Sequence, residues 1–239
     1  MVDADGGGVI LAIDASTEWA SLALLDPLTG AAWETGWTAG RDQTTALLPE
    51  IDHLLTLSGR SIRRVSGIVV ATGPGMFNAL RVGVSVAKGL VLGTGAPLIG
   101  CPTTLAAAAP AAGFGRTIVA AVPAGRNRLV WSRLSPERLS IERWPEVDAV
   151  NGSIEDLLAA LEGEEGEVVL TGEFSPDQEA RIQTATSPNV LLLAGGLNRR
   201  RAATMVALAA PAFLRGAVDN PASLEPVYAH ARAFPVASA

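Results

Sequence analysis

The stretch Ile68–Gly95, IVVATGPGMFNALRVGVSVAKGLVLGTG, decides the fold of this chain. It begins with an apolar segment, Ile68–Ala71, that has no polar face, as expected of a strand buried on both sides within an α/β sheet. The segment breaks at Gly73-Pro74-Gly75, and a long helix is predicted from Asn78 to Leu92. Glycines at such a turn either present N–H groups to an anion at the start of a helix or simply allow a tight turn, and both interpretations are open here.

The predicted helix is apolar almost all round. Gly83 and Ala87 lie four residues apart, as do Ser85 and Gly89, and valines and leucines fill much of the remaining surface. A helix of this kind must be covered on more than one side. Small residues four apart let another backbone come close, so we expect a helix shared between the core and a partner chain. The alternative is a central core helix inside one large domain.

The composition limits the classes of protein to consider. The chain has 239 residues, which suits two small lobes or one large α/β domain, and 49% of them are hydrophobic, so either the core is large or some apolar surface is meant for a partner. The net charge of −6 disfavours the chain as the main nucleic-acid-binding surface of an assembly. The acidic start, MVDADGGG, does not resemble a secretory leader, and no apolar run is long enough to cross a membrane, so a cytoplasmic chain is expected.

Cysteine and histidine are scarce. Cys101 is the single cysteine, which excludes an internal disulfide, and its place between glycine and proline after a strand favours a small buried filler over a nucleophile. The two histidines, His53 and His230, are far apart in sequence and form no helical metal-binding pair. The sequence therefore assigns no catalytic residue and no metal site.

The first half opens with three predicted strands, Val9–Asp14, Trp19–Leu25 and Ala31–Trp37, joined by short turns. Asp14 ends the first strand and faces a hydroxyl-rich turn. This arrangement resembles the phosphate end of the actin/hexokinase-like fold, in which the carboxylate positions magnesium and the turn holds phosphate. The alternative is that Asp14 only caps the turn. The candidate nucleotide-binding residues are Asp14, Ser16, Thr17, Gly73 and Gly75.

The second half repeats this opening. Thr117–Val122 and Arg128–Leu134 are predicted to pair as strands, with a third strand at Leu139–Trp144. Because the repetition is typical of a duplicated two-lobed fold, we expect a flexible tail over residues 1–8, an N-terminal lobe over 9–103, a C-terminal lobe over 104–214 and an extended segment over 215–239.

The only basic cluster, Arg199–Arg201, is predicted to lie in the first turn of a helix that Asn198 caps and that runs to Leu214. Cations oppose the helix dipole there. The cluster is therefore either a solvated face or has a role outside the helix.

Four stretches together resemble the TsaB/YeaZ family: Ile10–Glu18, Thr44-x-x-Leu-Leu-Pro, Gly73-Pro-Gly-x-Phe with the following Leu-Arg-x-Gly, and Glu225-Pro-Val-Tyr. The resemblance implies an α/β, actin/hexokinase-like (ASKHA, RNase H-like) duplicated fold. It also implies a non-catalytic subunit in tRNA threonylcarbamoyladenosine biosynthesis. The sequence departs from the family at Met76, Asn78 and Ala79 in the loop, at Gln43 before the first helix, and at Pro123–Val130 in the second-lobe hairpin, where the family's acidic residue is missing.

The resemblance also implies partners. Family members pair with the catalytic TsaD paralogue through the first two helices of the N-terminal lobe, predicted here over Thr44–Ser58 and Asn78–Leu92, and they act with a small TsaE-type ATPase. Alone, the chain is expected to form a homodimer through the same helices and to reach tRNA only through the complex. It is expected to hold no cofactor by itself. ATP and Mg²⁺ would instead bind at an interface of the complex. The residues expected to face a partner are Leu47, Leu48, Ile51, Leu55, Phe77, Leu80, Arg81, Gly83, Val84, Ala87 and Lys88.

A competing hypothesis is an enzyme of the same superfamily. An ATP-dependent small-molecule kinase would use Asp14 to position magnesium and the loop from Gly73 to Gly75 to hold phosphate. Against it, the first turn contains no glycine, and the second lobe has no clear Gly-rich adenosine loop, for which Gly195-Gly196 is the best candidate. A peptidase is disfavoured because the sequence shows no Ser-His-Asp, Cys-His or metal arrangement.

Overall fold

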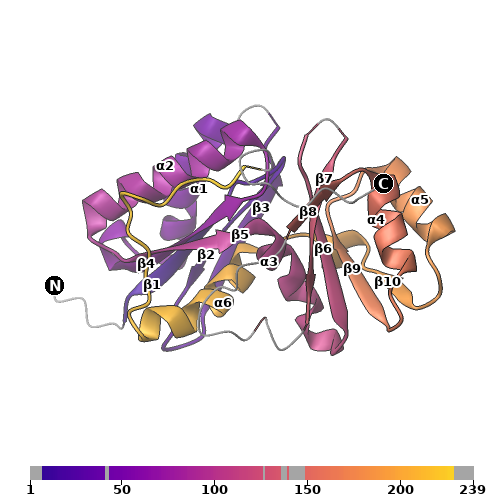
Figure 1. The fold of residues 1–239 in the computed structure, drawn as a ribbon. Helices are drawn as coiled ribbons and strands as arrows, with labels where there is room; N and C mark the ends of the chain where they lie inside the picture. The colour runs from indigo at the N-terminus through magenta and orange to yellow at the C-terminus, as the bar shows by residue number, and fades with distance from the viewer. Residues whose placement is uncertain (1–6, 41–42, 126, 136–138, 140–148, 229–239) are drawn as a thin grey trace.

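The computed structural model describes residues 7–40, 43–125, 127–135, 139 and 149–228. These residues form two lobes side by side, each built on one five-stranded sheet (Figure 1). The strand predicted over Leu139–Trp144 lies, apart from Leu139, outside the described residues. In the described part, the third antiparallel strand of the second sheet is instead β8, Ala149–Gly152.

The first sheet has the strand order β3-β2-β1-β4-β5. Strands β1 to β3 form an antiparallel meander, and β4 and β5 run parallel to β1. Its strands are β1 Val9–Asp14, β2 Trp19–Leu25, β3 Ala32–Thr38, β4 Val65–Gly73 and β5 Leu98–Pro102. The predicted buried central strand is thus confirmed as β4, between β1 and β5.

The second sheet repeats this topology with the order β10-β9-β6-β7-β8. Strands β6 to β8 are antiparallel, and β9 and β10 run parallel to β6. Its remaining strands are β6 Thr117–Pro123, β7 Leu129–Leu134, β9 Val168–Gly172 and β10 Val190–Leu192. The duplicated actin/hexokinase-like fold expected from the sequence is confirmed.

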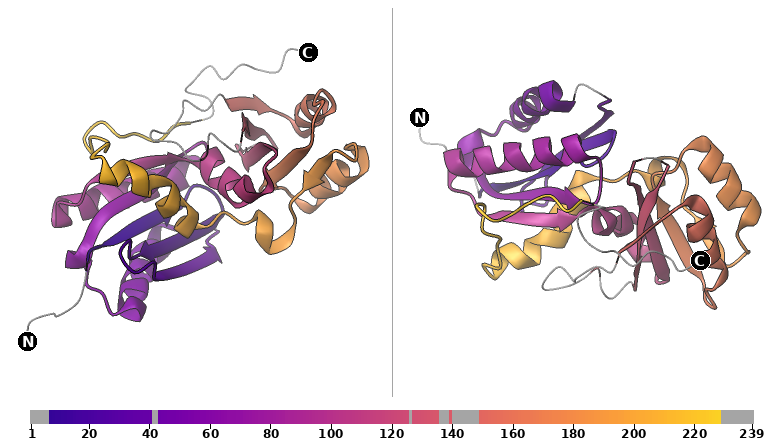
Figure 2. Two further views of the ribbon diagram at one scale, coloured as in Figure 1. Left: turned by 90° about the horizontal axis from the view of Figure 1, so that it is seen from below. Right: turned by 45° about the horizontal axis from the view of Figure 1, so that its top comes forward.

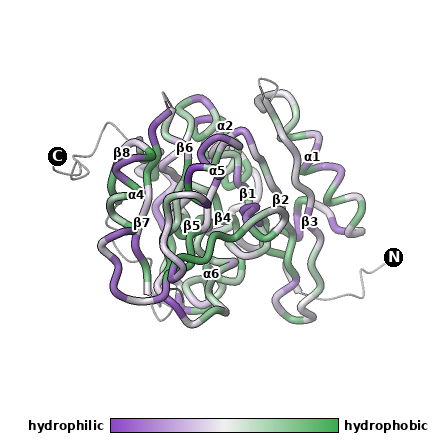
Figure 3. Tube along the Cα trace, turned by 90° about the vertical axis from the view of Figure 1, so that its right-hand side faces the viewer, coloured by the Kyte–Doolittle hydropathy of each residue, from purple (hydrophilic) through white to green (hydrophobic). Residues whose placement is uncertain are grey.

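Helices cover both faces of the first sheet (Figure 2). Alternate residues of a strand point to opposite faces. Leu11 and Ile13 of β1 accordingly pack with α1 (Gln43–Ser58) and α2 (Phe77–Thr94), whereas Ile10 and Ala12 pack with α6 (Ala202–Leu214). The α6 sequence contains no charged residue, and Figure 3 shows its apolar character.

The second sheet is also covered on both faces. One face packs with α4 (Ile154–Glu162) and α5 (Pro176–Ala185), and the other packs with α3 (Thr103–Ala108). The spacing of Ser175 and Gln178 in the sequence predicts a capping box, and the structure confirms it at the start of α5. Within the described residues, short 3₁₀ helices also lie at Ile62–Arg64, Ala109–Phe114 and Gly195–Asn198.

One helix that follows each sheet in sequence packs against the sheet of the other lobe. α3 follows the first sheet but packs against β6, and α6 follows the second sheet but packs against β1 and β2. The predicted lobe boundaries remain a prediction, but the range 104–214 includes α6, which belongs to the core of the first lobe. The chain therefore crosses between the lobes before α3 and again before α6.

The C-terminal strap, residues 217–228, continues from α6 across the edge of the first sheet. The Asp219 backbone N–H donates to the Leu98 carbonyl at 2.8 Å, and the Val227 N–H donates to the Thr72 carbonyl at 2.7 Å. The strap thereby protects the edge strand β5 and ends beside the start of α2. Within the described part of the chain, no helix is both long and apolar enough to span a membrane.

A buried carboxylate fixes the turn between β2 and β3. Asp26 is 1% exposed, accepts hydrogen bonds from the Leu28 and Thr29 N–H groups and pairs with Arg60 at 3.0 Å. The Leu28 hydrogen bond in particular, with Arg60 adding to it, lowers the pKa of Asp26. Because the folded pKa is depressed, the stabilisation is present above the unfolded value of about 3.9 and is lost as pH falls through the folded value.

We therefore expect Asp26→Asn to unfold at a lower urea concentration than the wild type at pH 7. The difference should narrow as pH falls below the unfolded value of about 3.9 and through the lower folded pKa, where the wild-type carboxylate also becomes protonated. Urea titrations of the wild type and Asp26→Asn at pH 7 and below about pH 4 measure this difference in stability. An equal difference at both pH values would show that the charge of Asp26 contributes nothing.

Candidate functional site

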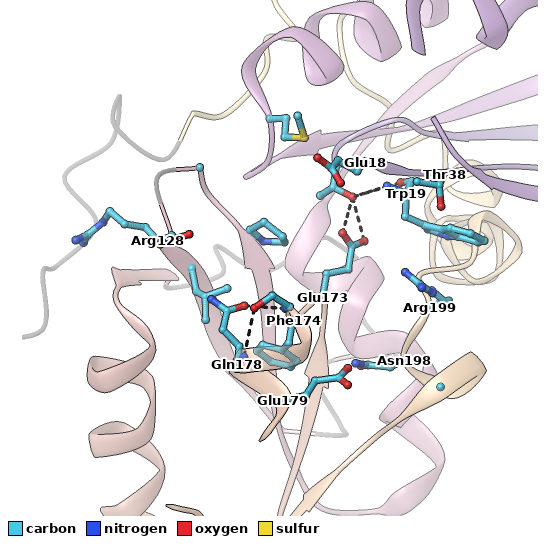
Figure 4. Close-up of a pocket in the computed structure, with 18 of the residues that line it drawn as sticks. Glu18, Trp19, Thr38, Arg128, Glu173, Phe174, Gln178, Glu179, Asn198 and Arg199 are labelled. Carbon is cyan, nitrogen blue, oxygen red and sulfur yellow. Dashed lines mark hydrogen bonds between the residues drawn. The ribbon is translucent and has the colours of Figure 1, made fainter. Parts of the chain in front are cut away.

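A cavity of about 930 Å³ lies between the two lobes (Figure 4). The first lobe contributes residues of the β1–β2 turn, and the second lobe contributes the ends of β6 and β9 and the start of α5. The polar and aromatic residues that line it are Thr17, Glu18, Trp19, Thr38, Asn127, Arg128, Glu173, Phe174, Ser175, Gln178, Glu179, Asn198 and Arg199.

Asp14 lies beneath this cavity and is completely buried. Its carboxylate accepts hydrogen bonds from the Ser16 N–H at 3.0 Å and from the Ser16 hydroxyl at 2.6 Å. Asp14 thus caps the turn that follows β1, which was one of the two alternatives for this residue.

The same carboxylate is paired with Arg200. The Arg200 Nε donates to Asp14 Oδ2 at 2.7 Å, and neither side chain is exposed. The guanidinium also donates to the Thr17 hydroxyl at 2.9 Å and pairs with Glu173 of the second lobe. Burial opposes the charge of Arg200, but the attraction of Asp14 and Glu173 outweighs it and raises the pKa of the guanidinium above its usual value.

A magnesium ion does not fit this arrangement. The acid that would position the ion already carries a cation in hydrogen-bond contact, and a second cation beside it would be repelled at short range. The Arg200 side chain therefore occupies the position beside the Asp14 carboxylate that a magnesium ion would need. The residues of this chain alone do not form the magnesium site of the kinase hypothesis.

The loop from Gly73 to Gly75 is packed against the protein's own backbone. A Cβ on Gly75 would lie 2.2 Å from the Ser16 carbonyl oxygen, and one on Gly73 would lie 2.3 Å from the Val227 carbonyl oxygen. The N–H of Met76, at the N-cap of α2, donates to the Ser16 carbonyl at 2.8 Å. The glycines thus make room for the β1–β2 turn and the C-terminal strap, as the tight-turn interpretation expects.

The candidate nucleotide-binding residues are close together but mostly do not face the cavity. Of the five, only Thr17 lines it, and its hydroxyl donates to the Glu173 carboxylate at 2.7 Å. Asp14 and Ser16 are completely buried. Arg200 contacts both Asp14 and Thr17, although it lies far from them in the sequence.

The basic cluster divides into three environments, which corrects both its predicted helical position and its interpretation as a solvated face. Helix α6 begins only at Ala202, with Arg201 as its N-cap residue. Arg199 lies over the Trp19 ring at 4.9 Å and lines the cavity, Arg200 is buried, and Arg201 donates to Glu34 at 2.8 Å on the surface.

Asn198 does not cap α6, contrary to the prediction. Its side-chain oxygen accepts the Gly172 N–H at 2.6 Å and the Thr171 hydroxyl at 3.0 Å. It therefore anchors the end of β9, from which Glu173 projects into the cleft. The sequence does not single out Glu173. Its one signal there is its place directly after Gly172, at the end of the apolar run that forms β9.

Most residues expected at a partner interface are buried in this chain's own core. Because their side chains already pack internally, they offer no surface to a partner, and that expectation is corrected for Leu47, Ile51, Leu55, Leu80, Gly83, Val84 and Ala87. The ideal Cβ of Gly83 would lie 3.4 Å from Ala15, so this small residue admits the first lobe's own turn. Of the remaining expected residues, Leu48, Phe77 and Arg81 are exposed and Lys88 is half-buried.

The other pair of small residues in α2 faces outward. Ser85 and Gly89 are exposed, and they share one side of the helix with Arg81 and with Leu92, which is 88% exposed. These four residues form the α2 stripe. At the start of α2, the Arg81 guanidinium lies over the Phe77 ring at 4.6 Å, and Phe77 contacts Tyr228 of the C-terminal strap at 4.7 Å.

Comparison with known proteins places the chain in a family. The family model described as "TsaD: tRNA N6-adenosine threonylcarbamoyltransferase" matches residues 37–163, more than half of the chain. The "tRNA threonylcarbamoyladenosine biosynthesis protein TsaB" of Escherichia coli K12 is 38% identical over 100 residues, which cover 41% of this chain and 42% of that protein. The chain belongs to this family. The TsaB names of its curated relatives agree with the TsaB/YeaZ resemblance of the sequence.

Further curated relatives carry the name of the matched family model. The tRNA N6-adenosine threonylcarbamoyltransferase of Solidesulfovibrio magneticus is 48% identical over 62 residues, covering 26% of this chain and 17% of that one. The matched stretches thus span about two fifths or less of the curated relatives. The structure of YeaZ from Pseudomonas aeruginosa superimposes with a TM-score of 0.72 and 23% identity over 92% of this chain and 99% of that chain, which supports the fold.

Proposed function

We propose that this chain acts in the biosynthesis of threonylcarbamoyladenosine in tRNA as a non-catalytic subunit that binds a TsaD-like catalytic paralogue. The names of its curated relatives supply the pathway. The observation that carries the non-catalytic role is the buried Arg200–Asp14 pair, because it places a cation where the superfamily's chemistry needs metal and phosphate. Any ATP and Mg²⁺ that the complex uses would then be held by the paralogue or by an interface between the chains.

The outer surface of α1 and α2 is the proposed contact with the paralogue. The α2 stripe offers two small residues over which a partner helix can approach closely, and Leu92 at its end is almost fully exposed. On α1, Leu48 is 54% and Leu57 is 60% exposed. Leucines this exposed on two helices that contact each other suit an interface better than open solvent.

Three further contacts belong to the same proposal. Without the paralogue, a homodimer would cover the same helices. A TsaE-like ATPase and the tRNA would then act on the assembled complex rather than on this chain alone. With a net charge of −6, the chain depends on its partners for affinity to the phosphate backbone of tRNA.

The kinase remains the second hypothesis because the cavity between the lobes is roomy and polar. It requires Arg200 to leave Asp14. Measurable ATP hydrolysis by the isolated chain that is lost in Asp14→Asn would favour the kinase over the subunit.

The proposed function is tested by size-exclusion chromatography with light scattering, on this chain alone and mixed with the TsaD-like paralogue of the same organism. We expect a homodimer that exchanges into a heterodimer. A chain that stays monomeric and ignores the paralogue would contradict the proposal.

One substitution tests the proposed interface directly. In Gly89→Arg, a cation would be placed in the middle of the α2 stripe, at a position where an added Cβ meets no atom within 4 Å of the folded chain. We expect at least a tenfold loss of affinity for the paralogue, because a charge without a partner would be buried in the contact. Gly166→Arg, at an equally open position on the second lobe, is the matched control. If the two variants bind the paralogue equally well, the contact lies elsewhere.

A further inference from the structure

We infer that Arg200 is a built-in cross-link that holds the two lobes closed at a fixed angle without any ligand. Enzymes of two-lobed construction commonly close around a ligand by bending where the chain passes between the lobes. In this chain, Arg200 lies on the second of the two crossings, between β10 and α6. Its guanidinium makes contacts that a bound ligand would otherwise have to supply.

On the side of the first lobe, Arg200 is anchored through both its side chain and its backbone. The guanidinium donates to Asp14 and Thr17 and to the Trp19 carbonyl, the last at 3.1 Å. The Trp19 indole N–H donates in return to the Arg200 carbonyl at 3.0 Å. The residue is therefore fixed to the β1–β2 turn, although it is 186 positions away from Asp14 in sequence.

On the side of the second lobe, the cross-link ends at Glu173. This side chain is 13% exposed and contacts both the Arg200 guanidinium and the Thr17 hydroxyl. Its backbone N–H donates to the Ala121 carbonyl of β6 at 3.2 Å, so its position is set by the second sheet. Figure 4 shows Glu173 reaching across the cavity toward the first lobe.

Opening the lobes would pull Glu173 away from a buried cation. Attraction between charges is strong where water is excluded, and a charge left without its partner there is costly. The closed arrangement is therefore favoured in the chain by itself. Loss of the Glu173 carboxylate should release the second lobe while leaving the Arg200–Asp14 pair, and with it the first lobe, intact.

Electron–electron distance measurements between spin labels test this cross-link. Labels at Thr56→Cys on α1 and Gln183→Cys on α5 report on the two lobes, and both positions are exposed. The native Cys101 does not interfere, because it is fully buried and burial raises the pKa of its thiol, which keeps it protonated and unreactive. Dilution with unlabelled chain removes distances between copies in a homodimer.

We expect one narrow distance distribution in the labelled wild-type background, unchanged by Mg²⁺ and ATP. Glu173→Ala should broaden it at least twofold in width, while circular dichroism shows that the variant remains folded. Arg201→Gln, which removes an exposed ion pair from the neighbouring residue, should leave the distribution unchanged. An unbroadened distribution in Glu173→Ala, or a shift of the wild-type distance on adding Mg²⁺ and ATP, would overturn the inference. Neither readout depends on whether the paralogue binds.

Discussion

Replacing Arg200 with methionine is expected to lower the free energy of unfolding by about 3–5 kcal/mol. The reason is the carboxylate left behind: Asp14 is completely buried, and in the variant it would lose its ion-pair partner. The Trp19 carbonyl and the Thr17 hydroxyl would lose the same donor. Urea unfolding followed by circular dichroism measures the change.

Two controls separate charge from packing in this experiment. Arg201→Met removes a neighbouring arginine whose side chain is 61% exposed, and an exposed pair of this kind contributes about 1 kcal/mol or less. In the double variant Asp14→Asn/Arg200→Met, the fully buried unpaired charge of Asp14 is gone and only that of Glu173, which is 13% exposed, remains. The double variant should therefore be more stable than Arg200→Met alone. Equal losses in Arg200→Met and Arg201→Met would mean that the buried pair does not stabilise the fold.

The second large effect is expected in the loop before α2. In Gly75→Ala, the added Cβ would lie 2.2 Å from the carbonyl oxygen of Ser16, which the Met76 N–H already uses. Backbone on both sides must move, so we expect a loss of about 1–3 kcal/mol in the free energy of unfolding, as for other overpacked sites. Thermal or urea unfolding measures it.

Gly93→Ala is the matched control for this loop. Gly93 lies within α2, and an added Cβ there meets no atom within 4 Å. Alanine in a helix interior is favoured over glycine by about 0.5–1 kcal/mol, so this variant should be more stable than the wild type. A Gly75→Ala protein as stable as Gly93→Ala would show that the loop is not tightly packed.

Much of the fold could be predicted because local signals agree with the final structure. The fully apolar Ile68–Ala71 predicted a strand buried on both faces, and β4 has that position. The strand pairs that open each half predicted the duplication. The spacing of Ser175 and Gln178 predicted the start of α5, because a capping box is complete within one helical turn.

The site could not be predicted, because its decisive contacts join residues far apart in sequence. The sequence shows three consecutive arginines but cannot show that the second is buried against Asp14 while its neighbours lie in the cavity and on the surface. The helix exchange has the same origin, since an apolar helix such as α6 can cover either sheet and only the path of the chain decides which.

The two pairs of small residues in α2 show a further limit. Gly83 with Ala87 and Ser85 with Gly89 follow the same spacing, and either pair could have faced a partner. In the structure, the first pair admits the turn and sheet of its own lobe, and the second pair faces outward. Spacing predicts that one side of a helix is closely approached, but it does not say by what.

The most direct test of the proposed role is the amount of threonylcarbamoyladenosine formed in tRNA by the TsaD-like paralogue as this chain is added. The reaction also contains the TsaE-like ATPase, ATP and the enzyme that supplies the threonylcarbamoyl donor. We predict that product rises with added chain and levels off at one chain per paralogue, and that Gly89→Arg fails to support it where Gly166→Arg succeeds. Modification that proceeds equally well without this chain would contradict the account.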